Sequence, residues 1–125
     1  MKIEDQVVSL EIAKKLKELG VKQESLFYWL CSGPDQFDDV PPPRVIRAYE
    51  FTAEFLERLP SAFTVAELGE LLPEEIHKND MRFQWKVQKY RFQYENRLEE
   101  FSMFGKTEAE ARGKMLILLL ENKIL

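Results

Sequence analysis

The C-terminal stretch, TEAEARGKMLILLLENKIL, constrains the fold of this chain more than any other segment. Thr107 and Glu110 have capping-box spacing, which predicts a helix over residues 107–121. Residues 115–120 are apolar on every side of that helix, so at least part of the helix is expected to be buried on most sides. The helix therefore either crosses the centre of the fold against a sheet or uses one face to form a homo-oligomer. Gly113 costs about 1 kcal/mol relative to alanine there, and we expect it to allow a close approach to the sheet.

The N-terminal stretch IAKKLKELGVKQESLFYWL has the outline of a DNA-reading helix-turn-helix. Ser9 can cap a helix over residues 9–19, and Gly20 can end it in a left-handed conformation. Ala13 and Gly20 lie too far apart for a helix-turn-helix, because the extra residues rotate the turn by roughly 300°. Residues 25–32 are rich in aromatic residues and would be apolar on both faces of a strand, as in a buried strand. The pattern therefore favours helix–turn–strand over helix-turn-helix.

Residues 32–44, SGPDQFDDVPPPR, contain four prolines, one glycine and three aspartates. Such a segment cannot continue a helix or a strand. Asp35, Asp38 and Asp39 do not have the spacing of a calcium-binding loop. The segment is predicted to be a surface loop, and a local binding loop is the alternative.

Two similar segments, AEFLERLP and AELGELLP, follow this loop. Each comes after a threonine that can cap a helix and each stops at a proline, which predicts short helices over residues 52–59 and 64–72. The outer faces of these helices are acidic, with only Arg58 as a basic residue. This is either an ordinary solvated face or a surface for a basic protein partner. The candidate contacts on it are Glu54, Glu57, Glu67 and Glu70.

The segment KNDMRFQWKVQKYRFQYENR, residues 78–97, carries six basic and two acidic residues, in a chain whose net charge is −4. Apolar residues alternate with polar ones over residues 82–87, as in a half-exposed strand. The aromatic residues that follow are one position out of phase, so a tight turn or a bulge is expected near residues 88–89. A further strand is expected over residues 97–104.

This basic aromatic segment, residues 82–97, is also a candidate for binding single-stranded nucleic acid. Aromatic side chains stack on unpaired bases, while lysine and arginine neutralise phosphates. The candidate contacts are Lys86, Lys89, Tyr90 and Arg91. The structural alternative is a sheet whose aromatic residues point into the core and whose basic residues face solvent, and we favour that alternative.

The bulk composition fits one globular domain spanning residues 1–125, with 45% hydrophobic and 32% charged residues. The negative net charge argues against a protein that coats nucleic acid. Cys31 is the single cysteine, so no internal disulfide forms, as is usual in a reducing compartment. No apolar run has the length of a signal sequence or of a membrane span. We therefore expect a cytoplasmic protein that does not contact a membrane.

Catalytic chemistry is not visible in the sequence. The single histidine, His77, has no partners at metal-ligand spacing, and the scattered glycines form no phosphate-binding loop. We expect no metal and no cofactor. An enzyme remains an alternative only if its site is assembled from residues that are distant in sequence.

Three segments, VSLEIAKKLKELGVKQESLFYW, TVAELGELLP and TEAEARGKMLILLLENK, resemble a set of small uncharacterised proteins of bacteria and their phages or prophages. The resemblance covers both ends of the chain well and covers the loop and the central sheet poorly. It implies a bacterial or phage cytosolic setting and an accessory role. It carries no activity and no functional residue.

These patterns together predict a small α+β domain. About four helices should pack on a mostly antiparallel sheet of three to four strands, drawn from residues 25–32, 82–95 and 97–104. The predicted core residues are Leu16, Trp29, Leu56, Leu68, Trp85, Phe92, Leu116 and Leu119. The leading functional hypothesis is a non-catalytic protein-binding accessory module that contacts an unidentified protein through the acidic helices or the proline-rich loop. Nucleic-acid binding through residues 82–97 is the first alternative, and an enzyme is the second.

Overall fold

The computed structural model describes residues 2–30, 42–78, 81–88, 91–95 and 100–125. It confirms the predicted α+β class, because the described residues form four α-helices and two antiparallel sheets. The helices are α1 (Leu10–Glu18), α2 (Ala53–Leu56), α3 (Val65–Leu71) and α4 (Glu108–Glu121). Two short 3-10 helices, η1 (Ile3–Asp5) and η2 (Ala48–Glu50), precede α1 and α2. No helix among the described residues is long and apolar enough to cross a membrane.

The strands form two separate sheets, whereas the sequence analysis predicted one. The small sheet pairs β1 (Phe27–Leu30) with β2 (Arg44–Arg47). The large sheet has the order β3 (Glu75–Lys78), β4 (Met81–Gln88), β5 (Arg91–Glu95) and β6 (Glu100–Phe104), each strand antiparallel to the next. The prediction that the strand near residues 25–32 joins the central sheet is therefore wrong, because β2, which was not foreseen, pairs with it instead.

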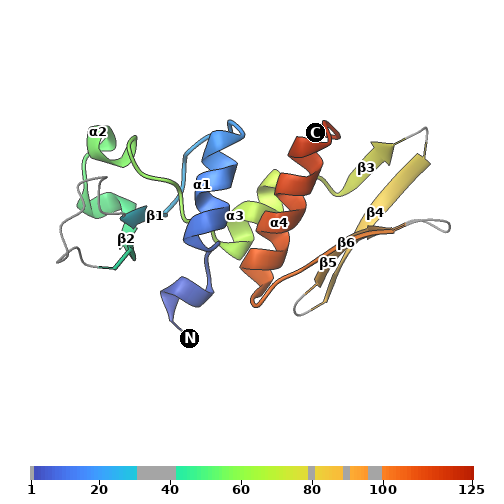
Figure 1. Ribbon diagram of the computed structural model, residues 1–125, viewed down its shortest axis with the longest axis horizontal. Coiled ribbons are helices and arrows are strands. Elements are labelled where there is room, and N and C mark those ends of the chain that lie inside the picture. The colour runs from blue at the N-terminus through green and yellow to red at the C-terminus, as the bar shows by residue number, and fades with distance from the viewer. Residues whose placement is uncertain (1, 31–41, 79–80, 89–90, 96–99) are drawn as a thin grey trace.

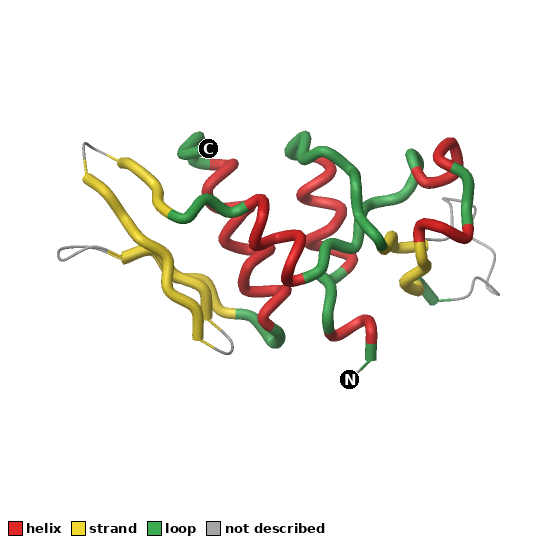
Figure 2. The backbone as a smooth tube through the Cα atoms, turned by 180° about the vertical axis from the view of Figure 1, so that it is seen from behind, coloured by secondary structure: helices red, strands yellow, loops and turns green. Residues whose placement is uncertain are grey.

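The elements lie in three groups along the molecule (Figure 1). The small sheet and α2 lie at one end, α1, α3 and α4 lie in the middle, and the large sheet lies at the other end. The view from behind shows that the helices cover only one face of the large sheet (Figure 2). The large sheet therefore has an inner face toward α4 and an outer face that no described helix covers, although Gln93 on that outer face is buried.

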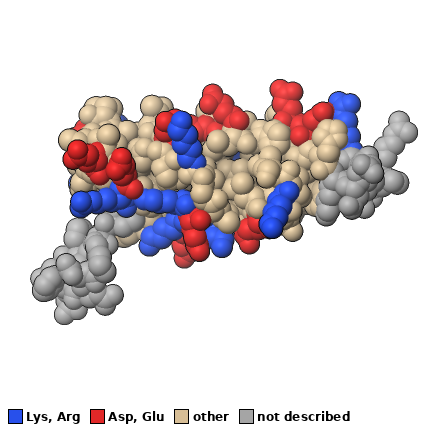
Figure 3. Space-filling model, turned by 90° about the horizontal axis from the view of Figure 1, so that it is seen from above, with Lys and Arg blue, Asp and Glu red and all other residues tan. Residues whose placement is uncertain are grey.

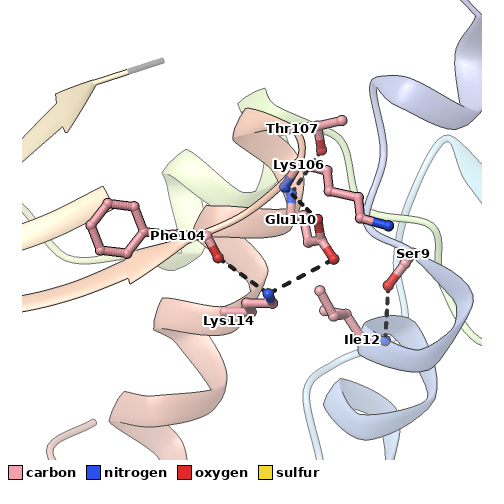
Figure 4. Close-up of polar contacts among 7 residues, drawn as sticks. All are labelled: Ser9, Ile12, Phe104, Lys106, Thr107, Glu110 and Lys114. Carbon is pink, nitrogen blue, oxygen red and sulfur yellow. Dashed lines mark hydrogen bonds and ion pairs between the residues drawn. The ribbon is translucent and has the colours of Figure 1, made fainter. Parts of the chain in front are cut away.

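The predicted helix caps are confirmed. The Ser9 hydroxyl accepts a hydrogen bond from Ile12 N at 3.4 Å, and Thr64 and Glu67 form a complete capping box at the start of α3. At the start of α4, Thr107 Oγ1 accepts from Glu110 N at 3.1 Å, and Glu110 Oε2 accepts from Lys106 N at 2.6 Å (Figure 4). These bonds satisfy amide groups that have no partner inside the helix.

The segment after α1 is a turn and a strand, as predicted, and it is not a second helix. Gly20 has φ +87°, a left-handed conformation that glycine adopts without strain. Tyr28 and Trp29 are neighbours in β1 and both are buried, so both faces of this strand are covered. Trp29 Nε1 donates a hydrogen bond to the Val8 carbonyl at 2.9 Å, which ties the small sheet to the start of α1.

Helix α4 lies at the centre of the fold, which explains its apolar sequence. It packs against α1 and α3 on one side and against β5 and β6 on the other. The prediction that Gly113 allows a close approach to the sheet is wrong. A Cβ atom at Gly113 would lie 2.7 Å from Ile12 Cγ2 and 2.9 Å from Val8 Cγ1, so the glycine allows close approach to the α1 region rather than to the sheet. A homo-oligomer through α4 stays a prediction.

The change of aromatic phase in the large sheet comes from a hairpin, as predicted. Gln88 pairs with Arg91, so β4 and β5 are joined by residues 89–90, which lie outside the described residues. Trp85 is opposite Tyr94 and Val87 is opposite Phe92. Directly opposed residues point to the same side of a sheet, so these four share the inner face.

Most of the predicted core is confirmed. The buried residues from that prediction are Leu16, Trp29, Leu68, Phe92, Leu116 and Leu119. Leu56 is only partly buried and packs in a second, smaller cluster with Tyr28, Ile46 and Leu59. The prediction for Trp85 is wrong, because 45% of this residue is exposed.

Candidate functional site

Trp85 is a large aromatic residue that stays exposed although it lies on the face of the sheet that packs against the core. It lies on the inner face of the large sheet, and its ring stacks on Phe92 with centroids 5.9 Å apart and planes 8° apart. Helix α4 packs over β5 and β6, so it covers Phe92 on β5, whereas Trp85 on β4 lies beyond the helix. An exposed tryptophan held rigidly by a second ring is a common binding contact.

A hollow of about 120 Å³ lies beside Trp85. It is lined by Gly69, Leu72, Pro73, Glu74, Trp85, Phe92 and Arg112. The Arg112 guanidinium lies 5.6 Å from the Phe92 ring centroid, and its Nη2 donates to Glu108 Oε1 at 2.9 Å. Within the described part of the chain, the buried Arg112 Nε has no hydrogen-bond partner. The sequence analysis did not identify Arg112 as part of any site.

A second hollow, of about 310 Å³, also borders Trp85, next to the Glu75–Gln84 pair with which β3 begins. It is lined by Glu74, Glu75, Arg82, Gln84 and Trp85. Glu75 forms an ion pair with Arg82 and lies 3.5 Å from His77 Nε2. Glu74 is exposed and forms no ion pair with any described residue. Glu74 and Trp85 are therefore the two side chains shared by both hollows and free to meet a ligand.

Tyr94 fixes the wall behind these hollows. Its hydroxyl donates to the Pro73 carbonyl at 2.6 Å, which holds the segment before β3 against β5. Burial raises the pKa of the Tyr94 phenol above its usual range, and the positive charge of Arg112 opposes part of that shift. Tyr94 is fully buried, so it supports the site and does not reach a ligand.

The four acidic residues predicted to contact a protein do not form one surface. Glu54 and Glu57 are exposed on and just after α2, at the opposite end of the molecule from the large sheet (Figure 1). The Glu67 carboxylate accepts hydrogen bonds from Ser25 Oγ, Leu26 N and Thr64 N, so it is occupied within the fold. Glu70 is exposed beside a separate hollow of about 190 Å³. Acidic and basic side chains are interspersed over the face seen in Figure 3.

The residues predicted to contact nucleic acid are only partly described. Lys89 and Tyr90 lie outside the described residues, and Lys86 is placed only by its pairing with Gln93. Arg91 lies on the outer face, with its guanidinium 5.7 Å from the ring centroid of Phe104. Trp85 and Tyr94 lie on the inner face, so these aromatic residues and Arg91 are on opposite sides of the sheet.

The described residues contain no group of three or more histidine, cysteine, aspartate or glutamate side chains placed to hold a metal ion. Cys31 lies outside these residues. Comparisons of this chain with protein-family models, curated proteins and solved structures found no match. The resemblance to small bacterial and phage proteins therefore stays a prediction.

Proposed function

We propose that this chain is a non-catalytic protein-binding module in which Trp85 and Glu74 bind a lysine or arginine side chain of a basic protein segment. The observation that carries the proposal is the exposed Trp85 ring beside Glu74, whose carboxylate forms no ion pair with a described residue. Tryptophan is the side chain that attracts a cation most strongly through its ring face. A neighbouring carboxylate adds a charge-assisted hydrogen bond to the same cation.

The charges around Trp85 favour a basic ligand over an acidic one. Arg82 and Arg112 line the two hollows, but each is already paired, with Glu75 and Glu108 respectively. Glu74 is the acidic residue of these hollows that forms no ion pair with a described residue, so a cation of the partner would neutralise its charge. The hollows beside the ring give room for the aliphatic stem of a lysine or arginine, which packs on apolar surface while its charge stays at the rim.

Nucleic-acid binding by residues 82–97 is the weaker candidate. Stacking on bases needs exposed aromatic residues beside the basic ones. Tyr94 is buried, Trp85 lies on the opposite face from Arg91, and Arg82 is paired with Glu75. The contact of Arg91 with exposed Phe104 is the feature that still favours it.

A cytoplasmic setting and an accessory role in a bacterium or phage belong to the same proposal. The single cysteine fits a reducing compartment. The accessory role rests on the resemblance described above and on the proposal that the Trp85 site binds a partner rather than catalyses a reaction.

The test is a selection of short random peptides displayed on a surface and captured by the wild-type protein. We expect the enriched peptides to contain lysine or arginine next to apolar residues. A fluorescently labelled peptide from this set should lose at least about tenfold in affinity for Trp85→Ala, and less for Glu74→Gln. Tyr49→Ala is the matched control, because Tyr49 is an aromatic residue that is 81% exposed and lies in η2, away from the large sheet.

Two results contradict the proposal. One is a set of enriched peptides without basic residues, and the other is binding that Trp85→Ala leaves unchanged. A labelled single-stranded oligonucleotide should be titrated in parallel at low and moderate salt. Tight, steeply salt-dependent binding that is lost in Arg91→Glu would favour the nucleic-acid function instead.

A further inference from the structure

We propose that two copies of this chain pair edge to edge through β6, antiparallel, about a two-fold axis at Ser102. This surface is separate from the Trp85 site, and the proposal does not depend on the function proposed above. The pairing would join two four-stranded sheets into one continuous sheet.

Strand β6 is an end strand with little protection against pairing. It is the last strand of the large sheet, and no other described strand pairs with its outer edge. Its sequence, EFSMF, contains no proline and no lysine and only one charge, at Glu100. Proteins usually protect open edges with prolines, lysines or bulges. The opposite end strand, β3, has the sequence EIHK, which contains a lysine.

Two charges on the outer face, those of Arg91 and Glu100, are not neutralised by a described residue of the same copy. Glu100 is directly opposite Glu95 on β5, and like charges in such cross-strand positions repel. Arg91 is opposite Phe104, and its guanidinium lies over the Phe104 ring, close to the open edge. Among the described residues neither Arg91 nor Glu100 forms an ion pair, and the buried Arg91 Nε has no hydrogen-bond partner.

A second copy brings an opposite charge toward each of these two residues. The register that pairs all five residues of β6 places Ser102 opposite Ser102 of the second copy and Phe104 opposite Glu100 of the second copy. Arg91 then lies two strand spacings, about 10 Å, from that glutamate, and its guanidinium already reaches over the intervening Phe104. The two-fold axis repeats this contact, so the interface contains two such pairs, each between Arg91 of one copy and Glu100 of the other.

The same register also matches apolar residues on the inner face. Phe101 and Met103 are partly buried and pack against the core. In the paired sheet Phe101 would lie opposite Met103 of the second copy, which buries more of both side chains. The axis is perpendicular to the sheet, so both α4 helices would lie on the same face. Lys114 Nζ donates to the Phe104 carbonyl at 3.2 Å (Figure 4), and a carbonyl oxygen has a second lone pair with which it can also accept a bond from the second copy.

Sedimentation equilibrium of the full chain tests the association. We expect a reversible monomer–dimer equilibrium with a dissociation constant between about 1 µM and about 1 mM, as for a small interface. Glu100→Arg should raise this dissociation constant at least tenfold, because the introduced arginine would repel Arg91 of the second copy. Adding Arg91→Glu to this variant should bring the dissociation constant back to the wild-type value, because the ion pair forms again with its charges exchanged. A monomer throughout this concentration range, or a dimer that Glu100→Arg does not weaken, would overturn the proposal.

A disulfide tests the register. In a Cys31→Ser background, Ser102→Cys places one thiol on each side of the axis, and mild oxidation should give a covalent dimer. Gln84→Cys is the matched control, because Gln84 is exposed on the outer face two strands from the edge. Equal cross-linking of the two variants would show random collision and would also overturn the proposal.

Discussion

The Tyr94 hydroxyl donates a hydrogen bond of 2.6 Å to the Pro73 carbonyl. This bond joins the centre of the large sheet to the segment that links α3 to β3. Pro73 and the adjacent Glu74 line the hollow beside Trp85, so the position of Glu74 relative to the Trp85 ring depends on this buried contact. The candidate site is therefore supported by a hydrogen bond from a fully buried side chain.

Tyr94→Phe should lower the free energy of unfolding by about 1–2 kcal/mol. The substitution removes the hydroxyl and leaves the Pro73 carbonyl without its donor, and an unsatisfied buried acceptor costs about that much. Urea unfolding followed by circular dichroism measures the change. Tyr49→Phe is the control and should change stability little, because Tyr49 is 81% exposed. Equal effects of the two substitutions would contradict the role given to Tyr94.

The raised pKa of Tyr94 predicts a loss of stability in alkaline solution. The folded protein keeps the phenol protonated, while the unfolded chain releases this proton near the ordinary pKa of 10.0. Above about pH 10 the unfolded state therefore binds fewer protons, and the free energy of unfolding falls by about 1.4 kcal/mol per pH unit from this group. Below that pH its contribution is constant.

Comparison with Tyr94→Phe isolates this effect from the other groups that titrate at high pH. Urea unfolding of both proteins should show a constant difference in stability between about pH 7 and about pH 9. The difference should shrink as the pH rises above about 10, because only the wild type has the Tyr94 phenol. A difference that does not change with pH would show that Tyr94 ionises equally in both states.

Gly113→Ala should destabilise the protein although alanine is the better helix former. Alanine gains about 1 kcal/mol in helix propensity, but its Cβ would lie 2.7 Å from Ile12 Cγ2. Overpacking of this kind typically costs about 1–3 kcal/mol. In an Ile12→Ala background the cost of Gly113→Ala should fall, because the clashing methyl group is absent. A stabilisation by Gly113→Ala in the wild type would mean that α1 moves away freely.

Local signals in the sequence predicted the helices well. Ser9, Thr64 and Thr107 each cap the helix that was expected after them, because a cap depends on residues within one turn. Burial of α4 also followed from its composition alone. The shift of aromatic phase predicted the hairpin between β4 and β5, because alternation reports which face a residue occupies.

The sequence could not predict how far each face is covered. Alternation placed Trp85 on the inner face correctly, but its exposure depends on where α4 crosses the sheet and on where β3 begins. Both are properties of distant segments. The small sheet was missed for a similar reason, since β2 is four residues long and directly follows prolines. Arg112 joins the candidate site only because α4 packs against β5.

Glu67 and Glu70 give the last prediction, because they share one helix but differ in their contacts. Glu67 Oε1 accepts from Ser25 Oγ at 2.8 Å and from Thr64 N at 2.9 Å, while Oε2 accepts from Leu26 N at 3.1 Å. A glutamine has one acceptor oxygen, so Glu67→Gln turns an amide NH₂ toward at least one of these donors. We expect the free energy of unfolding to fall by about 1–3 kcal/mol.

Glu70→Gln removes the same charge from the same helix at an exposed position without a hydrogen bond to a described residue. It should change stability by less than about 0.5 kcal/mol. Urea unfolding of both variants at neutral pH separates loss of charge from loss of hydrogen bonds. Of these two glutamates, Glu67 is the one whose hydrogen bonds link α3 to the segment that enters β1. If the two variants lose equal stability, the acidity of α3 rather than the Glu67 contacts holds these segments together.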